Sequence, residues 1–212
     1  MLATLGVAML SGCARSPAGG FSPGPRRQLI VTMALAERLR SAYHYFIAID
    51  TDGDPGDGPV PLIATPSTPI PPTGFPIVIS DSDVPPQFMV WLNMGIFRQY
   101  RNQILIGPPF LAQVSPDGKT ITVTIDLDQV STTAETLDVN LITADSLIPS
   151  DDPLLPINYD GLGPSGNSYL AGIPVTQSGR FDNDSSAVPE GAGDAAEPEL
   201  DIVDWTIEVK IL

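Results

Sequence analysis

Apolar and polar residues alternate along several parts of this chain, which predicts β-strands. In 120–127 every second residue is apolar, and the residues between are Thr or Asp. Residues 204–212 repeat this spacing from Trp205 onward, 28–36 share it, and 137–143 show it more weakly. Because alternate side chains of a strand point to opposite faces, these segments predict strands with one buried face. Residues 28–36 would also fit the start of a helix, but we favour a strand.

The run at 43–49, Tyr-His-Tyr-Phe-Ile-Ala-Ile, is largely apolar on both faces of a strand. A sequence rich in Asp, Gly and Pro follows it directly at 50–58. Aromatic and β-branched residues bounded by turn residues are typical of a buried strand. We therefore expect 43–49 to be the central strand of a sheet. Residues 87–93, apolar on both faces, predict a second inner strand.

Turn residues and composition define the fold class. Ser115-Pro116-Asp117-Gly118 predicts a hairpin, because Pro presets the first turn dihedral and Gly accepts the left-handed position. Residues 75–80 and 96–106 are further strand candidates, and the 23 Pro and 19 Gly disfavour helices. The sequence predicts an all-β domain over 26–212. We expect a single antiparallel β-sandwich, immunoglobulin-like or jelly-roll-like, with long Pro-, Gly- and Asp-rich loops.

A long acidic segment at 145–199 lacks the strand periodicity and contains only one basic residue, Arg180. Structureless segments of this length are uncommon inside compact domains. Two interpretations stay open, a functional excursion and a disordered insertion. The strand predicted at 204–212 returns the chain to the sheet, which makes the segment an insertion rather than a tail.

The first thirteen residues have the pattern of a secretion signal. An apolar stretch too short to span a bilayer precedes small residues and the only cysteine, Cys13. Leu10-Ser11-Gly12-Cys13 resembles the lipobox of bacterial lipoproteins, although no Lys or Arg precedes the apolar stretch. The resemblance implies a protein anchored to membrane lipid through an acylated Cys13, with 14–25 as a flexible tether. The alternative is an unmodified cysteine in a removed leader.

The lipoprotein resemblance also implies a location. Such a protein is extracytoplasmic, and in a bacterium with two membranes the absence of Asp at position 14 implies the outer membrane. A lone cysteine has no partner for an intrachain disulfide, so the fold depends on its core and on any bound metal.

The loop at 50–58 is a candidate calcium site. Asp50, Asp52, Asp54 and Asp57 place four carboxylates within eight positions, and calcium prefers six to eight oxygen ligands. The first three follow the spacing of an EF-hand loop, but Pro55 replaces its glycine, which excludes a helix-flanked EF-hand. The alternative is a surface turn in which Asp side chains accept hydrogen bonds from nearby amides.

Charge and motifs exclude several functions. A net charge of −15 with ten Lys and Arg argues against nucleic acid, whose phosphates are neutralised by basic residues. The only histidine, His44, lies within a strand pattern, and neither a Gly-rich phosphate loop nor a nucleophile elbow occurs. The sequence does not single out a carboxylate pair for glycoside hydrolysis. We therefore expect a protein that is not an enzyme.

Binding of a surface ligand is the expected function. Tyr159 and Tyr169 lie among Asn, Asp and Ser residues in the acidic segment, where exposed aromatic rings would stack on sugars. The aromatic strand running into Asp-Thr-Asp-Gly also resembles that of DOMON-like and family 9 carbohydrate-binding-module-like sandwiches, over about 29–57. That resemblance implies a sugar or haem ligand, and one histidine disfavours haem. The alternative is a structural or assembly lipoprotein whose acidic loop binds an envelope protein.

Overall fold

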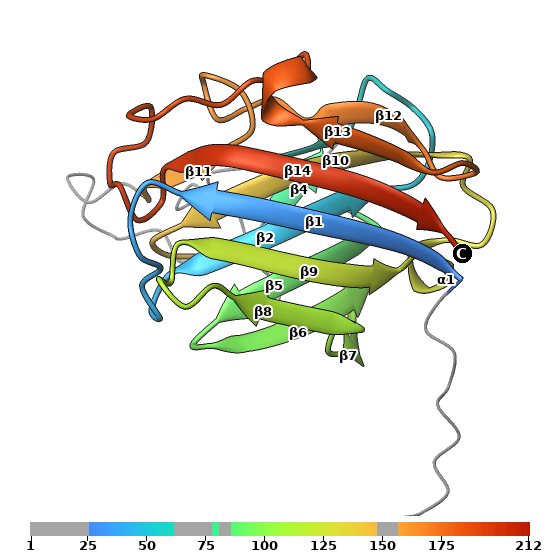
Figure 1. Cartoon of the computed structure of the whole chain (residues 1–212), viewed down its shortest axis with the longest axis horizontal. Coiled ribbons are helices and arrows are strands. Elements are labelled where there is room, and N and C mark those ends of the chain that lie inside the picture. Colours follow the sequence, from blue (N-terminus) through green and yellow to red (C-terminus); the bar gives the residue numbers. More distant parts are fainter. Residues whose placement is uncertain (1–25, 62–77, 81–85, 148–156) are drawn as a thin grey trace, which may run out of the picture.

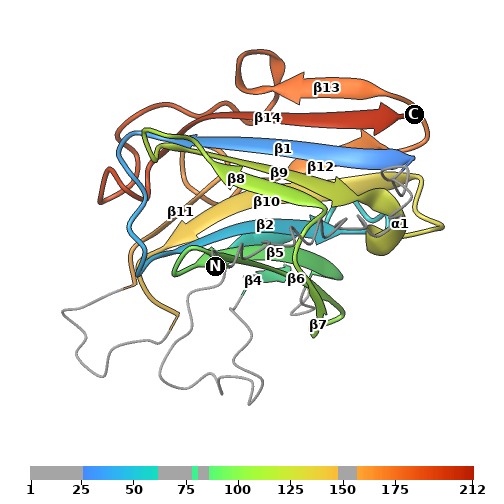
Figure 2. The same ribbon diagram turned by 60° about the horizontal axis from the view of Figure 1, so that its bottom comes forward.

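The protein is an antiparallel β-sandwich, which confirms the fold class predicted from the sequence. The computed structural model describes residues 26–61, 78–80, 86–147 and 157–212. Figures 1 and 2 show two sheets stacked face to face, with β14, β1, β9 and β8 in one layer and β10, β2, β5 and β6 in the other. Within the described part of the chain, no helix is long and apolar enough to span a membrane.

Sheet A has five strands that are all antiparallel to their neighbours. Their order is β13 (Gly179–Asp182), β14 (Ile202–Ile211), β1 (Arg27–Leu35), β9 (Thr120–Asp126) and β8 (Leu111–Val114). Strand β1 pairs with β14 from Arg27 opposite Ile211 onward, and it pairs with β9 on its other side. Only one face of β1 packs against the core, which explains its strict alternation.

Sheet B contains seven strands. Six follow the order β11 (Tyr159–Gly161), β10 (Thr136–Ala144), β2 (His44–Asp50), β5 (Phe88–Asn93), β6 (Ile96–Arg101) and β7 (Ile104–Gly107), and β12 (Leu170–Pro174) also pairs with β10. Four short elements complete the described chain. Strands β3 (Pro59–Pro61) and β4 (Val78–Ser80) pair antiparallel with each other, and the other two are helix α1 (Leu127–Val130) and 3₁₀ turn η1 (Asn183–Ser185).

The predicted central strand, β2, lies in the middle of sheet B with both faces buried. Tyr45, Ile47 and Ile49 pack into the core between the sheets. Phe46 and Ala48 point to the other face, where they form a second apolar cluster. Burial on both faces explains why this run lacks the alternation of β1.

Tight turns join consecutive strands at both ends of the sandwich. The predicted hairpin at 115–118 joins β8 to β9, with the amide of Gly118 donating to the carbonyl of Ser115 at 2.9 Å and a Gly118 φ of +77°. The strand expected at 96–106 is instead two strands. Asn102 and Gln103 have φ values of 47° and 65°, and this left-handed pair turns β6 back into β7.

The acidic segment 145–199, expected to lack strands, contributes three of them. Strands β11 and β12 pair with β10, and β13 pairs with β14, so the segment adds to both sheets. These strands have three to five residues, which is too short for a period of two to stand out. Residues 148–156 lie outside the described part of the chain.

Candidate functional site

The loop after β2 forms local turns of the kind the alternative interpretation predicts. The side chain of Asp50 accepts from the amide of Asp52 at 2.9 Å, Asp52 from Asp54 at 2.8 Å, and Asp54 from Gly56 at 2.9 Å. Carboxylate oxygens of Asp50, Asp52 and Asp57 lie within 4.8 Å of one another, and Asp54 is outside this group. Calcium binding by the four predicted carboxylates therefore stays a prediction. The structure brings three of the four side chains together.

Two buried carboxyl groups lie next to each other where β2 ends and this loop begins. Asp50 and Asp138 are cross-strand neighbours on β2 and β10. Burial raises the pKa of both, and the charges of Asp52 and Asp57 add to the effect. The side chain of Asp138 accepts from the amide of Gly172 at 2.7 Å, which links the loop to β12.

A second acidic cluster, which sequence reasoning did not identify, lies at the end of the sandwich where β11 and β14 begin. We define it as Asp160, Glu190, Asp194 and Asp201. Asp160 belongs to β11, Asp201 directly precedes β14, and the other two lie in the connection between η1 and β14. Carboxylate oxygens of Asp160, Asp194 and Asp201 lie within 4.8 Å of one another.

Three members of the acidic cluster are buried. Asp160 and Asp201 are each 3% exposed and Glu190 is 8% exposed, whereas Asp194 is exposed. Asp160 accepts from two backbone amides, those of Gly161 and Ile202, each at 2.8 Å. The bond from Ile202 connects β11 of sheet B to the first residue of β14 in sheet A.

Two oxygens of the acidic cluster have no hydrogen-bond partner among the described residues. Asp201 accepts from the amide of Gly193 through Oδ2 at 2.8 Å, and its Oδ1 is buried without a partner. Glu190 accepts from the amide of Gly163 through Oε1, and its Oε2 is likewise buried and unpaired. A buried acceptor without a partner costs about 1–3 kcal/mol, so both oxygens need a ligand, a proton or water.

The electrostatics of the cluster disfavour an empty, fully ionised state. Burial raises the pKa of Asp160 to about 7, and the charges of Asp194 and Asp201 act in the same direction. Burial raises the pKa of Glu190 to about 8, again with a contribution from its acidic neighbours. In the described part of the chain, no ion pair joins these four carboxylates to a basic side chain.

A polar cavity of about 280 Å³ opens beside the cluster. Its lining includes Asp160 and Asp194 together with Asn158, Tyr159 and Ser165. Tyr159 is partly exposed there, and its hydroxyl donates to Oδ1 of Asn167 at 3.3 Å. The cavity thus combines an aromatic face with hydrogen-bonding groups.

The two predicted tyrosines lie at different loops. Tyr169 lies against the loop after β2, where its hydroxyl donates to the carbonyl of Pro55 at 2.8 Å. A Cβ at Gly58 would come within 2.2 Å of the Tyr169 ring, so the ring packs directly on that glycine. Tyr159, at the polar cavity, is therefore the better placed of the two for stacking on a ligand.

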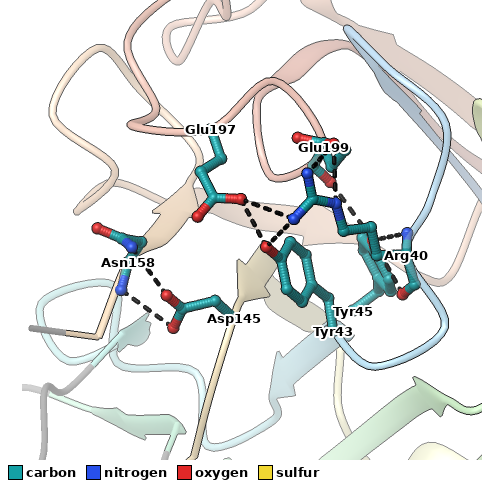
Figure 3. Close-up of polar contacts among 7 residues, drawn as sticks. All are labelled: Arg40, Tyr43, Tyr45, Asp145, Asn158, Glu197 and Glu199. Atoms are coloured by element: carbon teal, nitrogen blue, oxygen red, sulfur yellow. Dashed lines mark hydrogen bonds and ion pairs between the residues drawn. The ribbon is translucent and has the colours of Figure 1, made fainter. Parts of the chain in front are cut away.

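Two polar networks hold the segments that carry the cluster (Figure 3). The carboxylate of Asp145 accepts from the backbone and side-chain amides of Asn158 at 3.1 and 2.8 Å, which fixes the start of β11. The Arg40 guanidinium pairs with Glu199 and with Glu197. These pairs attach the connection before β14 to the loop between β1 and β2.

The predicted candidates outside these loops have other positions. His44 lies on the outer face of sheet B, where its Nδ1 accepts from Trp91 Nε1 at 3.2 Å and its ring stacks on Phe46. Burial lowers the pKa of His44, which favours the neutral, hydrogen-bonded ring. Cys13 lies outside the described residues.

The acidic cluster has only a general signal in the sequence, the excess of Asp and Glu over basic residues in 145–199. Its members are spread over about forty residues. The pairing of β11 with β10 and of β14 with β1, in two sheets that face each other, brings them together. No protein-family model matches this chain, and neither a curated protein nor a solved structure matches it.

Proposed function

We propose that this protein is a non-enzymatic, lipid-anchored cell-envelope domain that binds carbohydrate at the polar cavity beside Tyr159. The observation that carries the proposal is the composition of that cavity. It presents a partly exposed aromatic ring next to amide, hydroxyl and carboxylate groups. Sugar rings are recognised by this combination, because apolar ring faces stack on aromatic side chains while hydroxyls bond polar groups.

The size and position of the cavity fit this role. About 280 Å³ accommodates one or two sugar units, near the lower end of the range of small-molecule sites. The lining comes from β11, from the turn after it and from the connection before β14, all at one end of the sandwich. Loops presented at one end of a rigid sandwich are a common place for binding sites.

Paired variants at Tyr159 test glycan binding. Tyr159→Ala removes the stacking ring, and Tyr159→Phe keeps the ring while removing the hydroxyl that faces Asn167. We expect the Ala variant to bind about tenfold more weakly by calorimetry, equal to about 1.4 kcal/mol, and the Phe variant to bind nearly as the wild type. Wild-type protein that binds no glycan on an array would contradict the proposal, as would unchanged binding by Tyr159→Ala.

The anchor has its own experiment. Mass spectrometry of the native protein should find a diacylglyceryl-modified Cys13 at the mature N-terminus. Unprocessed Met1 in the membrane fraction would contradict the anchor and would leave the glycan proposal intact.

A protein partner is the second candidate, favoured by apolar side chains at the edge strands of both sheets. Four of them on or beside β7 and β8 are more than half exposed: Ile104, Leu105, Phe110 and Leu111. Edge strands with exposed apolar residues are common interaction surfaces. A photo-crosslinking residue at Leu105 should capture an envelope protein, and one at Asp184 tests the acidic segment instead. If neither position yields a crosslinked adduct, the result would contradict this candidate.

A further inference from the structure

We infer that the acidic cluster, Asp160, Glu190, Asp194 and Asp201, is a calcium-binding site. Three of its carboxylates already converge, with oxygens within 4.8 Å of one another. Calcium binds oxygens at about 2.3–2.6 Å, so two ligands on opposite sides of one ion lie up to about 5 Å apart. The observed spacing therefore matches the size of a calcium coordination shell.

The unpaired oxygens are the second observation. Oδ1 of Asp201 is buried in a residue that is 3% exposed, and Oε2 of Glu190 is buried in one that is 8% exposed. Neither has a hydrogen-bond partner within the described part of the chain, while their sister oxygens are held by backbone amides. The amide bond from Gly193 fixes the orientation of the Asp201 carboxylate and leaves its Oδ1 for a cation. Glu190 adds a buried negative charge beside the three converging carboxylates.

The ligand chemistry favours calcium over other metals. The three converging side chains are all carboxylates. Hard oxygen donors suit calcium, whereas zinc is usually held by Cys and His. The carboxylates come from three separate segments rather than one rigid turn. Calcium tolerates irregular geometry of this kind, and magnesium demands a near-ideal octahedron. Asp160 and Asp194 also line the polar cavity, which gives the ion an entry path.

An ion at this position would join the two sheets. Asp160 is on β11 at the edge of sheet B, and Asp201 directly precedes β14 of sheet A. With a single cysteine in the chain, a disulfide cannot make this connection. The cation site does not depend on the glycan proposal, because an ion there would stabilise the fold whether or not the cavity binds sugar.

Thermal unfolding of the full chain in calcium and in EGTA tests the inference. At calcium concentrations 100 times the dissociation constant, we expect the wild-type midpoint to rise by about 5–11 °C. Asp201→Asn and Glu190→Gln, which keep size and remove one charge, should lose most of this rise. The comparison variant is Asp52→Asn, which removes one charge from the calcium site predicted in the loop after β2 and so distinguishes the two sites; its amide oxygen can still accept from the Asp54 amide. It should keep the full rise.

Terbium binding gives an independent readout. Terbium replaces calcium, and the neighbouring Tyr159 would sensitise its emission, so the wild type and Asp52→Asn should luminesce while Asp201→Asn should not. If Asp201→Asn does not fold, Glu190→Gln decides the result. An unchanged wild-type midpoint without terbium emission would overturn the inference. It would also be overturned if Asp201→Asn and Glu190→Gln kept the rise, or if Asp52→Asn alone lost it, which would place the ion at Asp50 and Asp57.

Discussion

The close approach between β11 and the turn that follows it predicts that Gly161→Ala destabilises the protein. A Cβ at Gly161 would lie 2.5 Å from the backbone oxygen of Gly166. Ordinary contact begins at 3.4 Å, so the carbonyl has to move by about 0.9 Å. The turn cannot yield freely, because the amide of Gly166 bonds Gly163 and that of Ser168 bonds Leu162, each at 2.7 Å.

Overpacking of this kind costs about 1–3 kcal/mol. For a chain of this length, the melting temperature should fall by about 2–12 °C. Urea unfolding followed by tryptophan fluorescence, to which the buried Trp205 and the partly buried Trp91 contribute, measures the loss. The matched control is Gly179→Ala on edge strand β13, where the nearest atom to a new Cβ is 3.7 Å away. Equal stability of the two variants, within about 0.5 kcal/mol, would refute the reasoning.

Two further predictions concern buried polar groups near the cavity. Asn140 is fully buried and bonds the carbonyl of Pro59 and the amide of Leu162 at 2.7 and 3.1 Å, so Asn140→Ala should cost about 2–5 kcal/mol in urea unfolding. A loss below about 1 kcal/mol would contradict this. In EGTA, the raised pKa values of Asp160 and Glu190, about 7 and about 8, mean that the folded state holds more protons than the unfolded state. The contribution of these two groups to the free energy of unfolding should therefore be greatest below pH 4. As the pH rises toward 8, it should fall by up to about 1.4 kcal/mol per group for each pH unit. The Glu190→Gln variant should show a shallower fall than the wild type, and an identical slope would exclude the contribution of Glu190.

The long strands could be predicted because their environment is simple. Each face of β1 and β14 is either core or surface, so the residues alternate along their whole length. Strand β2 was recognisable for the opposite reason, since both of its faces are buried. The strands of three to five residues in the acidic segment gave no such signal. They are held by pairing with β10 and β14, which are remote in sequence.

The candidate site shows the same limit. The carboxylates of the loop after β2 can be found from the sequence because they are close together along the chain. Nearby backbone amides donate to three of them and hold the loop in local turns. Asp160 and Asp201 lie forty-one positions apart and meet only when β11 and β14 take their places. Their burial, and the unpaired Oδ1 of Asp201, are consequences of tertiary packing that no spacing rule contains. Tyr159, by contrast, was predicted from its polar neighbours and lines the cavity.

Crystals grown with calcium provide the most direct test that the acidic cluster holds a cation. The anomalous difference map should contain a peak about 2.3–2.6 Å from carboxylate oxygens of Asp160, Asp194 and Asp201. A map without a peak at that position, or with its peak beside Asp50 and Asp52 instead, would contradict the account.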